Sequence, residues 1–475
     1  MEKVFKIKER GSTVRAEILA GITTFFTLAY IVVVNPNQIA AEGATGWLVG
    51  LGANAAAMGQ IWNAVFVSSI LVAFLGTILY ALYANLPYAM ACGMGLNAFF
   101  CTCFVSGAFF SGVDVTAGYH SGLVIILISG IVFLVLSVTG LRKHIAVALP
   151  ECLKKAIPAG IGLFIAFIGF QNAGVIQANP YTLVQFADFH NYGWLESAPI
   201  LVALIGFILI AILSKLKVKG SVIIGILAAT LLHYLFLWQT PVVNFGNIGQ
   251  SFKDFGQVGI VGVFKGESWS GAFSGAHIGG VFSAIMLIIT FCLVDIFDTL
   301  GTLYGTATEA GLLDKNGDPI GIDKSMTSDS IATVSGAILG TSTCTTFVES
   351  AAGVAQGGRT GLTSLVTSIC LLACLVLSPI ALIIPASATA PALIYVGVLM
   401  LKNFSKVDME DLSSAVPAFL TLIMMPLTYS IANGIGIGAI AYVLIKLFTG
   451  KFKKIDIVVT IIAVLFILKF VFVTM

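Results

Sequence analysis

Residues 341–353 read TSTCTTFVESAAG and lie between two apolar segments, 328–340 and 361–384, in a chain where candidate membrane spans recur from one end to the other. It opens with a run of hydroxyl and thiol residues, which suits an extended backbone better than a helix. After Glu349 the residues are small and suit a helix. Irregular backbone at membrane depth must be buried in protein or line a cavity, so the stretch predicts a broken membrane span beside a binding site.

A second break lies far away in the sequence. Residues 87–99 read PYAMACGMGLNAF and combine Pro87, Gly93 and Gly95 with a polar Asn97. The two breaks fall in the third span of the chain and in the third span counted from the eighth. Paired interruptions at corresponding positions of two halves indicate a transporter site. Two halves of seven spans each have an odd number of crossings, so we expect them to be inverted relative to one another.

The composition supports a membrane protein throughout. Of the 475 residues, 58% are hydrophobic and 10% are charged, whereas soluble domains carry about 45–50% and about 25%. This balance excludes a water-soluble enzyme, a disordered chain and a disulfide-stapled scaffold. A net charge of +2 without a basic cluster excludes a nucleic-acid partner. We therefore predict an all-α polytopic protein whose surroundings are the lipid bilayer.

About fourteen candidate spans recur along the chain, followed by an extra apolar segment at 456–475. The spans lie near 18–38, 61–83, 86–105, 122–140, 156–176, 198–214, 220–238, 277–302, 328–340, 341–358, 361–384, 388–401, 413–433 and 434–449. With a cytoplasmic N-terminus, 21 of the 24 lysine and arginine residues fall on the inner side. We expect a multi-pass protein of the cell membrane in this orientation.

Three carboxylates remain at membrane depth once loop charges are set aside: Asp295 and Asp298 in LVDIFDTLGT, and Glu349. Such groups are functional candidates because burying them is costly. Asp295, Asp298, Thr299 and Thr302 fall on one helix face. A structural stripe bonded to a neighbouring helix is the alternative, most of all for Asp295. The sequence shows no metal-ligand or nucleophile motif, so neither an enzyme nor a metal site is expected.

Several segments together carry a family resemblance. They are ANLPYAMACGMGLNAFF (84–100), AIPAGIGLFIAFIGFQNAG (156–174), VDIFDTLGTLYG (294–305), LGTSTCTTFVESAAGVAQGGRTGLTSLV (339–366) and PAFLTLIMMPLTYSIANGIGIG (417–438). The chain resembles the AzgA-like purine permeases, a branch of the nucleobase/ascorbate transporter superfamily, over nearly its whole length. One departure is Cys92, which stands where many relatives have proline.

The resemblance implies a single transporter domain over 1–475, with a first repeat at 18–238 and a second at 277–449. A core domain would comprise 18–140 and 277–384, and a gate domain 156–238 and 388–449. Short antiparallel strands in the broken spans 3 and 10 would form the site. A homodimer is left open.

The resemblance also implies proton-coupled uptake of hypoxanthine or guanine. Adenine as substrate and equilibrative transport are the alternatives. Asn97, Asp298, Glu349, Phe347 and Gly95 would bind the base. Because burial favours the neutral form of a carboxyl group, Asp295 or Asp298 would carry the proton, and no other cofactor is expected. Carboxylates suit an oxopurine because they accept charge-assisted bonds from its N–H groups.

Overall fold

The computed structural model describes residues 2–139, 150–179, 181–190, 192–218, 220–241, 247–274, 278–310, 312–314, 319–377, 383–451 and 456–472. Six basic residues that the sequence assigns to the inner side lie outside these ranges, namely Arg142, Lys143, Lys219, Lys315, Lys453 and Lys454.

Helices make up most of the described chain. In chain order they are α1 (Glu2–Phe5), α2 (Val14–Leu28), α3 (Ile31–Ile39), α4 (Trp47–Gly50), α5 (Ala55–Leu79), α6 (Met94–Phe100), α7 (Gly107–Phe110), α8 (Val115–Thr139), α10 (Glu151–Asn172), α11 (Trp194–Lys215), α12 (Ser221–Leu237), α13 (Asn247–Asp254), α14 (Gly266–Ala272), α15 (Gly280–Ala310), α16 (Ile322–Leu339), α17 (Ser350–Ala355), α18 (Gly361–Ala373), α20 (Ala386–Leu401), α21 (Leu412–Leu427), α22 (Ile431–Phe448) and α23 (Ile457–Phe472). In the same described ranges four short strands accompany them: β1 (Met90–Cys92), β2 (Ile176–Asn179), β3 (Leu183–Phe186) and β4 (Cys344–Thr346).

Eight helical segments of the described chain are long and apolar enough to cross a membrane, and five shorter apolar helices accompany them. The long segments include Ala55–Ala84, Val115–Thr139 and Gly280–Leu300. This confirms a multi-pass membrane protein built of helices. The C-terminal stretch forms α23, which packs on α22, and the Tyr442 hydroxyl donates to Asp456 over 3.1 Å.

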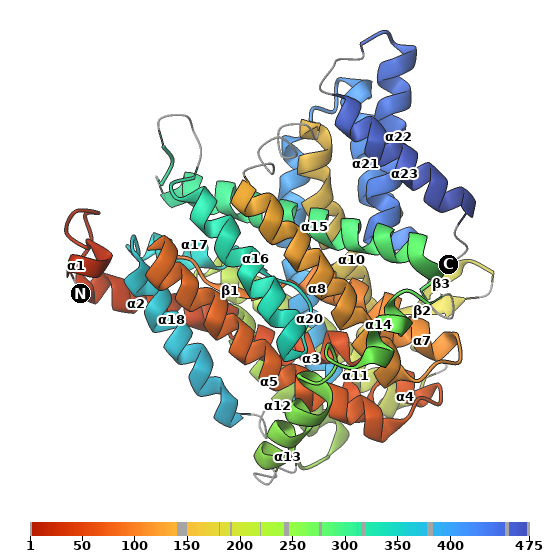
Figure 1. The fold of residues 1–475 in the computed structure, drawn as a ribbon. Helices are drawn as coiled ribbons and strands as arrows, with labels where there is room; N and C mark the ends of the chain where they lie inside the picture. The colour runs from red at the N-terminus through yellow and green to blue at the C-terminus, as the bar shows by residue number, and fades with distance from the viewer. Residues whose placement is uncertain are drawn as a thin grey trace.

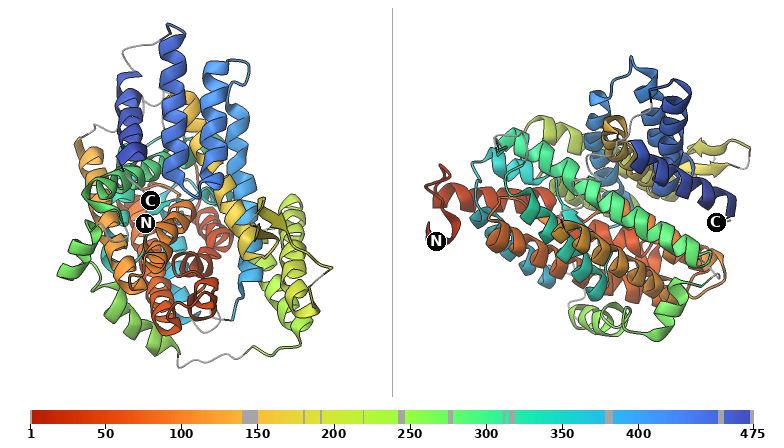
Figure 2. Two further views of the ribbon diagram at one scale, coloured as in Figure 1. Left: turned by 90° about the vertical axis from the view of Figure 1, so that its right-hand side faces the viewer. Right: turned by 45° about the horizontal axis from the view of Figure 1, so that its top comes forward.

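The helices pack into two bundles, which we define by their members. The first bundle contains α2, α3, α5, α8, α16, α17 and α18; the second contains α10, α11, α12, α20, α21 and α22. In the left view of Figure 2 the blue helices α21 and α22 of the second bundle stand above the red, orange and cyan helices of the first. The long helix α15 packs on α8 and α17 of the first bundle and on α10 of the second, and Figure 1 shows it crossing the molecule.

Small residues let the helices of the second bundle approach closely. A Cβ on Gly162 of α10 would lie 2.6 Å from the Met400 Cβ and 2.9 Å from the Gly397 carbonyl of α20. Backbones separated this narrowly gain packing energy that larger side chains would prevent, a common device in membrane helix pairs.

The first bundle is interrupted by a two-stranded sheet made from the two broken spans. Strands β1 and β4 pair antiparallel, with Met90 opposite Thr346 and Cys92 opposite Cys344. Helix α6 starts just after β1, and α17 starts shortly after β4. Gly340 ends α16 with a φ of +98°, and a Cβ there would lie 2.6 Å from the Gly259 Cα, so only glycine suits this turn into β4. The expected strands in spans 3 and 10 are present.

Candidate functional site

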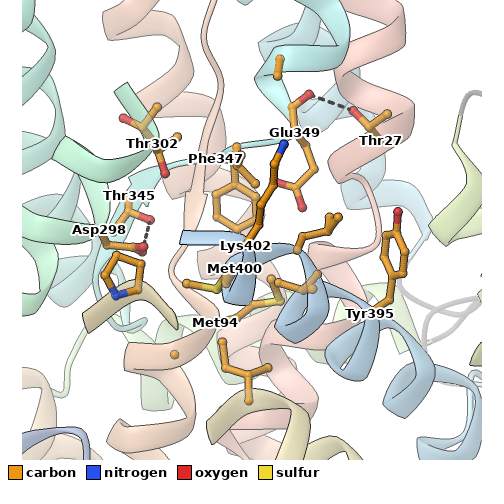
Figure 3. A pocket seen from close by; sticks show the side chains of 18 of the residues that line it. Thr27, Met94, Asp298, Thr302, Thr345, Phe347, Glu349, Tyr395, Met400 and Lys402 are labelled. Atoms are coloured by element: carbon orange, nitrogen blue, oxygen red, sulfur yellow. Dashed lines mark hydrogen bonds between the residues drawn. The ribbon is translucent and has the colours of Figure 1, made fainter. Parts of the chain in front are cut away.

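A cavity of about 410 Å³ lies between the two bundles, next to the paired strands β1 and β4. Its volume falls within the roughly 300–1,000 Å³ of small-molecule sites. The first bundle, the segments around the paired strands β1 and β4, and α15 supply Thr27, Gly93, Met94, Gly95, Asp298, Thr302, Thr345, Phe347 and Glu349. The second bundle and the turn after α20 supply Ile161, Ile165, Ser214, Tyr395, Met400 and Lys402. Figure 3 shows both groups facing the same space.

Glu349 stands where the extended segment of β4 turns into α17. Its side chain is partly exposed to the cavity, and the hydroxyl of Tyr30 donates to its Oε1 over 2.6 Å. The Thr27 hydroxyl lies 3.4 Å from its backbone carbonyl. The carboxylate is thus anchored to the first span of the chain through one oxygen.

Asp298 lies on α15 and also lines the cavity. The Thr345 hydroxyl of β4 donates to its Oδ2 over 3.4 Å. Phe347 is 5% exposed, and Figure 3 draws its ring between Asp298 and Glu349. Two carboxylates and an aromatic ring, all expected from the sequence, therefore share one cavity wall.

Asp295 is separated from this wall. It is 1% exposed and does not line the cavity, and the Thr333 hydroxyl of α16 donates to its Oδ2 over 2.8 Å. One turn further along α15, the Thr299 hydroxyl donates to Asp329 of α16 over 2.5 Å. The other oxygens of both carboxylates, Oδ1 of Asp295 and Oδ1 of Asp329, are buried without a hydrogen-bond partner among the described residues. The inner part of the α15 polar stripe thus bonds to α16.

Asn97 is placed differently from the expectation that it faces Glu349. It is fully buried in α6, and its amide donates to the Asn35 side chain of α3 rather than projecting into the cavity. Asn35 in turn donates to Ser69 and Thr341. Helix α6 begins only three residues earlier, and the face that Asn97 presents is set by packing against α3, which periodicity in α6 alone does not reveal. Gly95, by contrast, lines the cavity, and a Cβ there would lie 2.3 Å from the Ile161 Cγ2.

Three residues in or near the site are not predicted from the sequence. Asp329 is not among the three carboxylates expected at membrane depth, because the predicted ninth span, 328–340, places it at the very end of that span; α16 begins at Ile322, which places Asp329 about two turns inside the helix. Tyr30 gave no signal, because a tyrosine in an apolar span is ordinary. Lys402 follows directly after α20 and lines the cavity, whereas the sequence places it only among the 21 basic residues of the inner side.

The wall chemistry suits a flat, uncharged molecule rich in N–H groups. Carboxylates accept charge-assisted bonds, the Phe347 ring offers a stacking face, and hydroxyls of Thr302 and Thr345 add neutral partners. Among the described residues, no group of three or more His, Cys, Asp or Glu side chains could hold a metal ion.

Comparison with known proteins points the same way. The model of the permease family matches residues 15–437. The chain is 40% identical over 475 residues to the guanine/hypoxanthine permease PbuG of Bacillus subtilis, covering 99% of this chain and 100% of that protein. It is 38% identical over 473 residues to the adenine permease AdeP of Escherichia coli, covering 100% of this chain and 96% of that protein.

The fold also resembles a solved transporter at low sequence identity. The transmembrane domain of the cyanobacterial bicarbonate transporter BicA superposes with a TM-score of 0.57 at 15% identity, covering 88% of this chain and 97% of that domain. This likeness concerns the arrangement of helices alone.

Proposed function

Because the chain belongs to the permease family, whose model matches residues 15–437, we propose that it is a purine nucleobase transporter that carries hypoxanthine and guanine across the cell membrane. It is a transport protein and not an enzyme. The observation that supports this substrate class is the cavity wall, where Asp298, Phe347 and Glu349 lie together beside the paired strands β1 and β4.

The proposed recognition follows from the hydrogen-bonding pattern of the bases. An oxopurine carries an N1–H, and guanine adds an exocyclic amine beside it, so one carboxylate accepts one bond from hypoxanthine or two from guanine. Such bonds are roughly twice as strong as neutral ones. Phe347 stacks on the ring face. Asn97 holds α6 against Asn35 and so positions Gly95 at the cavity, instead of touching the base.

Adenine is the alternative substrate, and the 38% identity to the adenine permease AdeP supports this alternative. Adenine presents an acceptor at N1 and a donor only at its 6-amino group on that edge, so it offers a carboxylate one bond where guanine offers two. The carboxylate that accepts the N1–H of hypoxanthine or guanine would instead face the N1 lone pair of adenine, and that unmade buried bond costs about 1–3 kcal/mol.

For the architecture, we propose about fourteen spans in two inverted repeats with the N-terminus in the cytoplasm. The first bundle together with α15 corresponds to the core domain that binds the base, and the second bundle to the gate domain. Movement of one against the other then exposes the cavity to alternate sides. The position of the cavity between the two bundles supports this division.

For the driving force, we propose proton symport, with Asp295 or Asp298 as the proton carrier. Support comes from Asp295, which is buried on α15 one turn away from the cavity-lining Asp298. Equilibrative transport is the alternative. Uptake measured with and without a protonophore separates the two mechanisms.

A competition series tests the substrate assignment. Purified protein in detergent is titrated with hypoxanthine, and guanine, adenine, xanthine and uracil compete for the site. We expect guanine and hypoxanthine to bind most tightly, adenine more weakly and uracil least. Adenine binding tighter than hypoxanthine would establish the alternative substrate, and binding of none of the five would overturn the proposed function.

A further inference from the structure

One face of the first span lies along the short helix that carries the base-reading carboxylate. Thr24, Thr27 and Tyr30 are spaced three residues apart through the end of α2, where Ala29 and Tyr30 continue the helical backbone. A Cβ on Gly353 of α17 would lie 2.0 Å from the Thr24 Oγ1, and the Thr27 hydroxyl lies 3.4 Å from the Glu349 carbonyl. The start of α17 is therefore held against this face.

Tyr30 belongs to the same face and hydrogen-bonds to the side chain of Glu349. Its ring is 1% exposed, and its hydroxyl donates to Oε1 of Glu349 over 2.6 Å. Within the part of the chain that the structure describes, no other side chain hydrogen-bonds to this carboxylate. The second oxygen, Oε2, is left for a ligand in the cavity.

We propose that Tyr30 is a positioning residue of the transport site, which fixes the Glu349 carboxylate so that Oε2 faces the purine. This inference rests on the proposed function, because it assigns Tyr30 a task only if Glu349 reads the base. A carboxylate at the end of a three-torsion side chain otherwise samples several rotamers, and ordering it on binding weakens affinity.

The bond also bears on the charge of Glu349. A hydroxyl donor on Oε1 stabilises the ionised carboxylate, which is the form whose Oε2 accepts a charge-assisted N–H bond from the purine. The other titratable groups that line the same cavity are Asp298 from α15, Tyr395 from α20, and Lys402 and Lys406 from the turn after α20. Among the ion pairs of the described residues, none joins either lysine to Glu349, so Tyr30 is the contact that a substitution can remove cleanly.

The test is Tyr30→Phe, which removes one oxygen and keeps the ring. Hypoxanthine binding to the purified full-length variant should weaken about tenfold, as expected for loss of a bond to a charged group. The acid limb of the pH dependence of binding should move to higher pH, because the ionised carboxylate loses a donor. In a Glu349→Gln background, Tyr30→Phe should cause little further loss, since coupled residues are not additive.

Tyr119→Phe is the matched control. Tyr119 is another fully buried tyrosine of the first bundle, and its hydroxyl donates to the Gly340 carbonyl away from the cavity lining. This variant should lower thermal stability while leaving hypoxanthine affinity within about twofold of the parent protein.

The outcomes separate this inference from the proposed function. If the parent protein binds purines through Glu349 but Tyr30→Phe leaves affinity and pH dependence unchanged, Tyr30 has no positioning role. Equal losses in both backgrounds would assign it a purely structural role. If Tyr30→Phe alone fails to fold, rescue of folding by Glu349→Gln supports the coupling, and failure of the double variant overturns it. Failure of the parent protein to bind any purine defeats the proposed function itself.

Discussion

At the residue scale, Glu349 is the group on which we propose that purine recognition depends most directly. Glu349→Gln keeps the size of the side chain but replaces a charged acceptor with an amide that also donates. We expect hypoxanthine binding to weaken by about 1.5–3 kcal/mol, the usual contribution of a bond to a charged group. Isothermal titration of the purified variant measures the change, with its thermal unfolding showing that it remains folded. An unchanged affinity would remove Glu349 from the base-reading groups.

Substitutions of the two aspartates of α15 should have different effects on transport, because the two side chains have different surroundings. Asp298 lines the cavity, whereas Asp295 is buried behind it and bonded to Thr333. We therefore expect Asp298→Asn to weaken purine binding about tenfold or more. Asp295→Asn should instead reduce the uptake rate or flatten its pH dependence, with affinity changed less. Binding in detergent compared with uptake at several pH values distinguishes them, and loss of binding only in Asp295→Asn would reverse these roles.

At the scale of elements, the interruptions of both broken spans could be predicted from local chemistry. The hydroxyl-rich run before Phe347 forms β4, and the segment after Pro87 forms β1. The pairing of the two strands came from the family resemblance, because pattern within one span says nothing of its partner. The directions of side chains and the ends of helices could not be predicted as well from the sequence, because they depend on neighbours far away in the chain. Asn97 thus faces Asn35, and Asp329 lies inside α16.

The contact between α2 and α17 offers a test at this scale. Gly353→Ala would place a Cβ 2.0 Å from the Thr24 Oγ1 and 2.8 Å from the Ala20 carbonyl, so α17 must move away from the first span. We expect about 1–3 kcal/mol of destabilisation from overpacking, and weaker hypoxanthine binding because Glu349 moves with α17. Thermal unfolding and titration report the two effects.

Gly249→Ala, in another helix, is the control for Gly353→Ala. Gly249 lies in α13, and a Cβ there would meet nothing within 4 Å. This variant should keep both stability and affinity close to the parent values. If Gly353→Ala behaves like Gly249→Ala, the packing of α17 on the first span does not determine the site.

At the scale of the whole molecule, composition and hydropathy were sufficient to predict a multi-pass helical protein, because the bilayer requires long apolar helices whatever the substrate. The placement of the cavity between two bundles could not be read from those quantities. It depends on which helices pair across the membrane, and α10 and α20, more than 200 residues apart in the sequence, pack together here. The second bundle's contribution to the cavity, including Tyr395 and Lys402, follows from that pairing.

Orientation in the membrane is the remaining property of the whole molecule, and two exposed positions on either side of α11 test it. Tyr181 is 93% exposed in the hairpin of β2 and β3 before α11, and Lys217 is exposed just after it. Because lysine and arginine accumulate on the cytoplasmic side, we expect Tyr181→Cys to react with a membrane-impermeant maleimide on intact cells. Lys217→Cys should react only after permeabilisation. The eight native cysteines are buried or half-buried, and replacing the half-buried Cys103 and Cys370 with serine lowers the background. Labelling of Lys217→Cys from outside, with Tyr181→Cys protected, would place the N-terminus outside and invert the direction in which the cavity must open to release its purine.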